Sequence, residues 1–183
     1  MLFTGRLFFD FDSYDVWRIY TTMVKASQER DVAVEVDWRP FLVEDIDSEA
    51  DMPSHTRGLA ACEAVRDSHP EQYDRFVGAM MTLTYQEKDD PGSDKTLAVA
   101  AQVAGVDRDA VIGRALDPGL RLLEKATVAA RERGVSDVPT IERQGPPVYI
   151  KTTGAANYGN AVERLELINR MLDEDGIWTL AKP

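Results

Sequence analysis

Hydrophobic residues near the N-terminus change their spacing within a few positions. The run Leu7–Phe11 is short and mostly apolar, which is typical of a strand buried on both faces. Apolar residues then recur at steps of three and four, which indicates an amphipathic helix; they are Val16, Ile19, Tyr20, Met23 and Val24. The change of period places Ser13, Tyr14 and Asp15 in the first turn of that helix, where unpaired N–H groups and the helix dipole favour an anion or a reactive group.

A second strand follows this helix, which we expect to end near Arg30 and Asp31. The segment Val32–Val36 alternates and is rich in β-branched residues. Pro40 lacks an N–H donor, so ladder pairing should end about there. Two strands joined by one helix form a right-handed unit with parallel strands.

The chain is acidic and irregular from Asp45 to Asp51, and beyond Asp51 its pattern is helical for about eighty residues. We expect about five helices and no strand in this segment. Ser93 or Asp94 is well placed to cap the helix that contains Leu97, and Pro118 is expected to be the first residue of the last of the five helices.

Strand patterns return after Gly134. Two short strands, Val138–Ile141 and Val148–Lys151, flank a Gly-Pro-Pro turn and predict an antiparallel hairpin. Asn157 or Asn160 can cap a final amphipathic helix. The tail beyond residue 173 contains Trp178 and two other large apolar residues, so we expect it to lie against an apolar surface.

The order of elements therefore predicts an α/β protein with the order β-α-β, helical insert, β-β-α. Residues 1–45 form the N-terminal half and residues 46–133 the all-helical insert between the second and third strands. Residues 134–173 form the C-terminal half and residues 174–183 a tail. A chain of 183 residues is about one domain in size.

The charge balance excludes several classes of partner. Lys and Arg number 21 against 32 Asp and Glu, so the net charge is −11, and the pI is near 4.6. Such a chain repels nucleic-acid phosphates and anionic lipid headgroups, so we expect neither nucleic acid nor a membrane as partner. With no long apolar run and a single cysteine, Cys62, we expect a soluble protein kept in the cytoplasm.

Four stretches resemble a known family when they are taken together. They are Asp10-Phe11-Asp12-Ser13 leading to Trp17, Trp38-Arg39-Pro40-Phe41-Leu42, Gly134-Val135-Ser136-Asp137-Val138-Pro139-Thr140, and Gly154-Ala155. In this order around a helical insert, they are similar to the DsbA/FrnE-like branch of the thioredoxin superfamily. That branch includes kappa-class glutathione transferases and 2-hydroxychromene-2-carboxylate isomerases. The resemblance covers roughly Arg6 to Leu172 and implies a thioredoxin-like fold.

The resemblance also implies a site. Pro139 is expected to be a cis-proline, and Val138 to offer its backbone to an extended thiol substrate that faces Tyr14 and Trp17. Where dithiol members have Cys-x-x-Cys, this chain begins with Ser13, and a hydroxyl cannot replace the attacking thiolate of thiol–disulfide exchange. Serine at this position matches the transferases and isomerases, in which it donates a hydrogen bond to the thiolate of a bound co-substrate. Ser13 is therefore the candidate catalytic residue.

Asp15 sets a condition on this chemistry. A carboxylate about 4 Å from a thiolate repels it by about 4 kcal/mol at an effective dielectric of about 20. The helix terminus stabilises the thiolate by about 0.3–1 kcal/mol, and a charge-assisted hydrogen bond stabilises it by about 1.5–3 kcal/mol. The repulsion is larger than either contribution. Thiolate chemistry therefore requires Asp15 to face solvent or to pair with a base such as Arg18 or Arg39.

The implied partners are small molecules. They are a low-molecular-weight thiol, glutathione or mycothiol, as co-substrate, and an electrophilic or isomerisable second substrate. No covalently bound cofactor is expected. The sequence does not decide whether the chain forms a homodimer. Whether the chain is an enzyme is also open, because a thioredoxin-fold binding module without catalysis fits the same residues.

A third hypothesis is a phosphatase of the haloacid-dehalogenase type. Asp10 and Asp12 match its first motif, in which the first aspartate is the nucleophile and the second is the acid/base. That chemistry needs further acids and a lysine on later parallel strands, for which the sequence gives no pattern. His55 and His69 lack ligand-spaced neighbours, so no metal site is predicted, and Cys62 is expected in the core.

Overall fold

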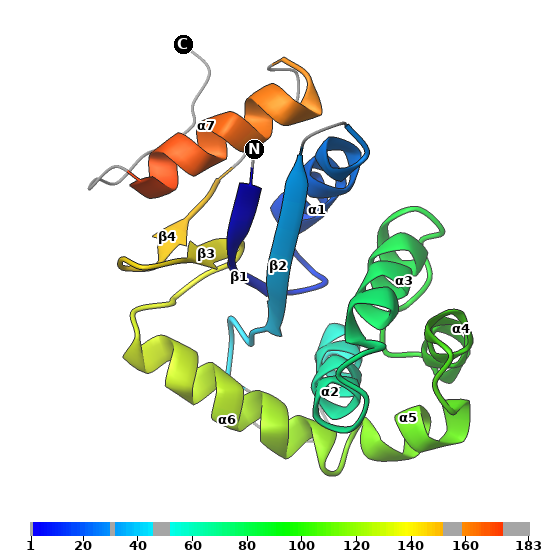
Figure 1. The fold of residues 1–183 in the computed structure, drawn as a ribbon. Helices are drawn as coiled ribbons and strands as arrows, with labels where there is room; N and C mark the ends of the chain where they lie inside the picture. The colour runs from blue at the N-terminus through cyan, green and yellow to red at the C-terminus, as the bar shows by residue number, and fades with distance from the viewer. Residues whose placement is uncertain (1, 30–31, 46–51, 152–158, 174–183) are drawn as a thin grey trace. The chain divides into compact units, whose positions relative to one another are not determined.

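The computed structural model describes residues 2–29, 32–45, 52–151 and 159–173. The described elements confirm the predicted order, with five helices between the second and third strands (Figure 1). Their bounds are β1 Leu2–Phe9, α1 Tyr14–Ser27, β2 Ala33–Pro40, α2 Ser54–Ser68, α3 Tyr73–Tyr85, α4 Asp94–Ala104, α5 Arg108–Arg114, α6 Gly119–Glu132, β3 Thr140–Glu142, β4 Val148–Tyr149 and α7 Ala161–Asp173.

The chain divides into two compact units. The sheet unit contains residues 1–9, 13–39 and 133–183, and the helical unit contains residues 10–12 and 40–132. The helical unit thus includes the segment that follows β2, in which Leu42 donates its backbone N–H to Thr127 Oγ1 of α6 at 3.1 Å. The loop Asp10–Asp12 also belongs to the helical unit, which the sequence does not predict.

The sheet has four strands in the order β2-β1-β3-β4. β1 and β2 run in the same direction in Figure 1, as expected for strands joined by one helix. β3 pairs antiparallel with β1, with Leu7 opposite Ile141, and β4 pairs antiparallel with β3, with Val148 opposite Ile141. The predicted hairpin is therefore confirmed, and β1 is the buried inner strand, with Leu7 and Phe9 fully buried.

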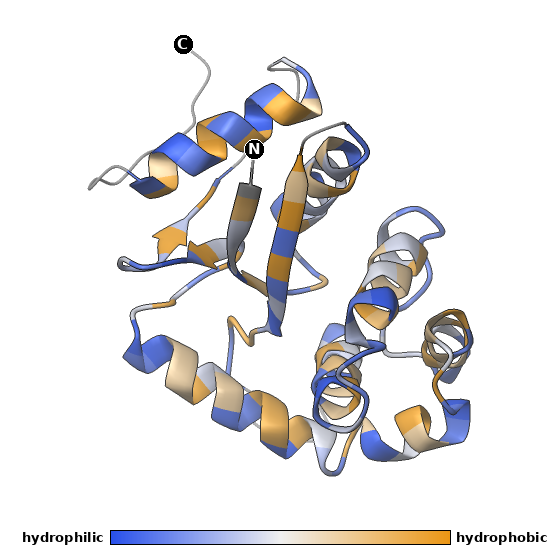
Figure 2. Ribbon diagram, in the orientation of Figure 1, coloured by the Kyte–Doolittle hydropathy of each residue, from blue (hydrophilic) through white to orange (hydrophobic). Residues whose placement is uncertain are grey.

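Two amphipathic helices complete the sheet unit. α1 packs against α7, and each helix buries one stripe of its surface. The buried apolar residues are Val16, Ile19, Met23 and Ala26 on α1 and Leu165, Ile168 and Met171 on α7. α1 ends at Ser27, before the predicted end at Arg30 and Asp31, which lie outside the described residues. Figure 2 shows the alternation of apolar and polar residues along α7.

The helical unit has its own apolar core. Its largest fully buried side chains are Phe41, Leu59, Phe76, Met80, Met81 and Leu97. Ser93 caps α4 as predicted, since its Oγ accepts the N–H of Thr96 at 3.2 Å. α6 begins at Gly119 rather than at Pro118, whose carbonyl accepts the N–H of Leu122 at 3.0 Å.

Gly119 sits at a close contact between two helices. A Cβ at this position would lie 2.4 Å from the carbonyl oxygen of Ala60, so only glycine lets α6 approach α2 this closely. Among the described residues, no helix combines the length and the apolar composition that crossing a bilayer requires. Asn157 and the tail with Trp178 lie outside the described residues.

Candidate functional site

Ser13 occupies the N-cap position of α1, in an extended backbone conformation with φ −96° and ψ 109°. Its carbonyl accepts the N–H of Val16 at 3.1 Å, while its side chain does not cap the helix. The hydroxyl instead donates to the carbonyl oxygen of Val138, with 3.4 Å between Oγ and O. The structure therefore brings together the candidate catalytic residue and one of the predicted thiol-binding residues.

The backbone around Pro139 is held at several points. The Val138–Pro139 peptide bond is cis. The N–H of Val138 donates to Asp137 Oδ1 at 2.7 Å, and the Thr140 hydroxyl donates to the carbonyl of Asp137 at 2.6 Å. The carbonyl of Pro139 accepts the N–H of Ile150 at 2.9 Å. The segment that leads into β3 thus has a defined backbone conformation beside Ser13.

Asp15 is paired with a base. Its Oδ1 lies 3.3 Å from Arg18 Nη1, one turn further along α1, whereas Arg39 pairs with Asp37. The Arg18 guanidinium also lies 4.9 Å from the centre of the Tyr14 ring, whose side chain is exposed. The condition that the sequence sets for thiolate chemistry is therefore met through Arg18.

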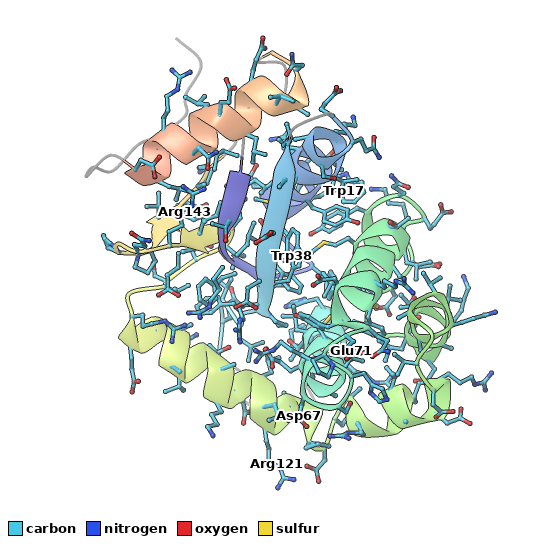
Figure 3. The ribbon with its side chains drawn as sticks, viewed as in Figure 1. Trp17, Trp38, Asp67, Glu71, Arg121 and Arg143 are labelled. Carbon is cyan, nitrogen blue, oxygen red and sulfur yellow. The ribbon has the colours of Figure 1, made fainter. Side chains whose placement is uncertain are left out.

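Trp17 belongs to an aromatic cluster within the sheet unit. Its ring stacks on Tyr20, with 5.5 Å between ring centres and 21° between planes. Tyr20 in turn lies 5.6 Å from Trp38 of β2, and Trp38 contacts Phe9 edge-on. Trp17 and Trp38 are labelled in Figure 3. Burial raises the pKa of the Tyr20 hydroxyl above its usual value. This stacking gives Trp17 a packing role, and a role in thiol binding stays a prediction.

Asp137 and Tyr149 are residues that the sequence analysis does not single out. Tyr149 lies on β4 and is 39% exposed. Its pKa is raised first by partial burial, then by the nearby charges of Asp137 and Asp15 and by a hydrogen bond to the Asp137 side chain. The Asp137 carboxylate therefore accepts both the Tyr149 hydroxyl and the Val138 amide. An acid directly before a Val-Pro pair is the sequence feature that could have revealed it.

Asp10 and Asp12 form a turn in the helical unit rather than a phosphatase site. Asp10 is buried, and its Oδ1 accepts the N–H of Asp12 at 3.1 Å. Burial raises the pKa of Asp10, and His55, whose Nε2 lies 3.8 Å from Oδ2, opposes this shift. The Tyr85 hydroxyl donates to the Asp10 carbonyl at 3.4 Å. β3 and β4 are antiparallel to their neighbours, so the later parallel strands that a phosphatase needs are not formed in the described sheet.

The remaining candidates have structural roles. Cys62 is fully buried in α2, and burial raises the pKa of its thiol well above the usual value, which makes it unreactive. The His69 ring lies after the end of α2, with Nδ1 2.8 Å from Ser68 Oγ. The described residues contain no group of three or more His, Cys, Asp or Glu side chains placed to hold a metal ion.

Solved structures with a similar fold are thioredoxin-fold proteins. A 2-hydroxychromene-2-carboxylate isomerase is similar with a TM-score of 0.64 at 14% identity, over 92% of this chain and 94% of that chain. Pseudomonas aeruginosa DsbA is similar with a TM-score of 0.57 at 16% identity, over 93% of this chain and 82% of that chain. A thioredoxin-like oxidoreductase from Silicibacter pomeroyi DSS-3 is similar with a TM-score of 0.59 at 14% identity, over 93% of this chain and 87% of that chain. No family model matches the sequence, and no curated protein does.

These likenesses define the class of the fold, which is a DsbA-like thioredoxin fold with a helical insert. Cys62 is the single cysteine of the chain, and it is buried in α2. The chain therefore has this fold without a redox dithiol. At these identities the likeness shows the fold alone, and the chemistry has to be argued from the residues.

Proposed function

We propose that this protein binds a low-molecular-weight thiol, glutathione or mycothiol, at Ser13 and the Val138–Pro139 segment. Ser13 stabilises the thiolate, which then attacks an electrophile or assists an isomerisation. The observation that supports this proposal most directly is the approach of Ser13 Oγ to within 3.4 Å of the Val138 carbonyl. The hydroxyl stands at the segment expected to dock the peptide-like part of the thiol.

The local charges permit a thiolate at this position. The first turn of α1 presents N–H groups and the positive end of the helix dipole. The Arg18 guanidinium lies 3.3 Å from Asp15, so its positive charge opposes the repulsion that an unpaired carboxylate would exert on the thiolate. Ser13 can then contribute a charge-assisted hydrogen bond worth about 1.5–3 kcal/mol. The sulfur arrives with the co-substrate, so the protein needs no cysteine of its own.

The transfer reaction is balanced without a redox partner. The bound thiol loses its proton to solvent, and the thiolate forms a carbon–sulfur bond with the electrophilic carbon of the second substrate. In a transfer reaction the bond to a leaving group breaks at that carbon. A similar fold occurs in a solved 2-hydroxychromene-2-carboxylate isomerase, which supports isomerisation as the second form of the proposed chemistry.

Calorimetric titration with glutathione and with mycothiol tests the proposal. We expect Ser13→Ala to weaken binding roughly 10- to 100-fold, because a charge-assisted hydrogen bond is lost. The pKa of the bound thiol, followed by thiolate absorbance, should rise in the same variant. Ser27→Ala is a matched control, because Ser27 is exposed at the far end of the same helix and its hydroxyl bonds only locally to the Val24 carbonyl. Equal binding by wild type and Ser13→Ala would contradict the role of Ser13.

A binding module without catalysis is the second candidate. It is favoured by Asp137, whose side chain already holds the Val138 amide that a peptide-like thiol would use. Under this candidate, neither thiol binds to the wild type at millimolar concentration. Weak binding that Ser13→Ala leaves unchanged would also favour it.

A further inference from the structure

We infer that the thiol recognised at this site carries an ammonium group close to its sulfur, and that Asp137 is the residue that selects it. This inference rests on the thiolate chemistry proposed for Ser13, and it replaces glutathione and mycothiol by an aminothiol as the substrate class. It follows from the groups beside Ser13 that are already engaged and from those that still have hydrogen-bonding capacity.

The donor that a peptide-like ligand would need is occupied. Val138 N–H lies 2.7 Å from Asp137 Oδ1, a short charge-assisted hydrogen bond. A ligand carbonyl that took this N–H would replace a carboxylate acceptor by a weaker neutral one. It would also leave the Asp137 oxygen without that donor, which costs free energy at a partly buried position. Docking through the Val138 amide is therefore unfavourable while Asp137 is ionised.

The groups with spare capacity are acceptors. An ionised carboxylate can accept about four hydrogen bonds. Asp137 accepts one from Val138 N–H and one from the Tyr149 hydroxyl, so it can take further donors. The Val138 carbonyl accepts from Ser13 and has a second lone pair. A ligand that fits this edge offers N–H donors rather than carbonyl acceptors.

The negative charge at the site also favours a ligand with an ammonium group. The charge of Asp15 is balanced by Arg18 at 3.3 Å. By contrast, no lysine or arginine forms an ion pair with Asp137 in the part of the chain that the structure describes, and its partners are neutral. The negative charge of Asp137 also acts on Tyr149, whose pKa is raised first by burial and then by this charge. An uncompensated carboxylate attracts an ammonium and repels the carboxylates of a ligand such as glutathione.

The ammonium also favours the chemistry. A positive charge two or three atoms from the sulfur lowers the pKa of the thiol. Ser13 and Asp137 then have separate roles: the hydroxyl contacts the sulfur, and the carboxylate contacts the ammonium. Asp137 acts as a specificity-determining residue.

The test compares probes that differ in charge. Cysteamine carries an ammonium close to its sulfur, and N-acetylcysteamine has the same thiol without the charge. Glutathione carries two carboxylates and one ammonium that is remote from its sulfur. In titrations of the wild type at low salt, we expect cysteamine to bind at least 10-fold more tightly than N-acetylcysteamine, and glutathione to bind most weakly. Asp137→Asn keeps an oxygen for the Val138 amide and removes the charge, so this preference should fall to within about 3-fold.

The controls separate this inference from the proposed function. Asp109→Asn removes the same charge from an exposed position on α5 and should leave the preference unchanged. Equal binding of cysteamine and N-acetylcysteamine by the wild type, or an unchanged preference in Asp137→Asn, overturns the inference alone. Failure of all three thiols to bind the wild type overturns the proposed function with it. The wild-type comparison decides the question even if a variant does not fold.

Discussion

The Ser13 hydroxyl reaches the Val138 carbonyl across 125 residues of sequence, with 3.4 Å between Oγ and O. The antiparallel register of β1 and β3 explains this approach, because Phe8 lies opposite Thr140. The chain that leaves β1 therefore runs alongside the chain that enters β3. Sheet pairing alone thus places the start of α1 beside the cis-proline segment, and both residues belong to the sheet unit.

A thiol placed at the N-terminus of α1 tests the electrostatics of this position. In Ser13→Cys we expect a thiol pKa below the usual value of about 8.5, because the helix terminus stabilises the thiolate and Arg18 balances Asp15. The rate of alkylation by iodoacetamide as a function of pH measures this pKa. The wild type is the control, since its Cys62 is fully buried and should not react in the folded state. Adding Arg18→Ala should raise the pKa, and a value above about 8.5 in Ser13→Cys alone would count against the site.

Asp10 should make stability depend on pH. Burial raises its pKa in the folded state, so the folded protein binds this proton more tightly than the unfolded chain does. Stability therefore falls as the pH rises from the unfolded pKa through the folded pKa, and ionised Asp10 costs free energy above that window. Asp10→Asn cannot ionise and still accepts the Asp12 N–H, so it should gain stability relative to wild type at neutral pH.

The gain in Asp10→Asn should vanish in acid, where both the folded and the unfolded wild type are protonated at this position. The charge of nearby His55 lowers the pKa of Asp10 and so opposes the effect of burial, which limits the size of this gain. Asp10→Ala also cannot ionise but lacks the acceptor of the Asp12 amide, so it should be less stable than Asp10→Asn by about 0.5–1.5 kcal/mol. Urea unfolding between acid and neutral pH measures these differences. A constant offset between wild type and Asp10→Asn at every pH would contradict the argument.

Arg131 should contribute more to stability than another arginine of the same helix. It donates to the carbonyls of Leu42 and Val43 at 3.1 Å and 3.2 Å and pairs with Asp45 at 2.6 Å, so it holds the segment after β2 within the helical unit. We expect Arg131→Ala to lower the free energy of unfolding by about 1–3 kcal/mol. The matched control is Arg121→Ala, also on α6 and 73% exposed, which should change it by less than about 0.5 kcal/mol (Figure 3). Equal effects of the two substitutions in thermal unfolding would refute the role of Arg131.

The start of α7 contains a reciprocal cap. Asn160 Oδ1 accepts the N–H of Glu163 at 3.0 Å, and Glu163 Oε2 accepts the N–H of Asn160 at 2.9 Å. Asn160→Ala should cost about 0.5–2 kcal/mol, and Asn160→Asp should cost much less because aspartate also caps well. Chemical unfolding of the two variants measures the difference. If Asn160→Asp lowered the free energy of unfolding as much as Asn160→Ala, the amide group would have a role beyond capping the helix.

Much of the fold follows from sequence periodicity. The switch of spacing after Phe11 correctly indicates that a helix begins near Ser13, and Pro40 correctly marks the end of β2. Pairing of β3 with β1 is not visible in the sequence, because β3 spans three residues and its partner is set by tertiary packing. The loop Asp10–Asp12 likewise joins the helical unit through contacts with residues far away in the chain.

The candidate site is predictable in part. Resemblance indicates Ser13, Val138 and Pro139, which the structure brings together. The role of Asp137 is missed, because its hydrogen bond to the next residue depends on one side-chain rotamer that no periodic pattern encodes. The phosphatase hypothesis arises at Asp10 because a turn and a nucleophile both place an acid after a buried strand, and in the structure Asp10 accepts the N–H of Asp12 in such a turn.

A hydroxyl group has a single hydrogen, and in Ser13 that hydrogen points to the Val138 carbonyl. The same hydrogen cannot serve a sulfur at the same time, so the empty and the thiol-bound protein differ in which atom receives it. Isotope labelling of the Val138 carbonyl would make this exchange visible, since its infrared stretching band shifts to higher frequency when the Ser13 hydrogen leaves. The amide I region of one labelled bond would then report occupancy directly, without any turnover of a second substrate.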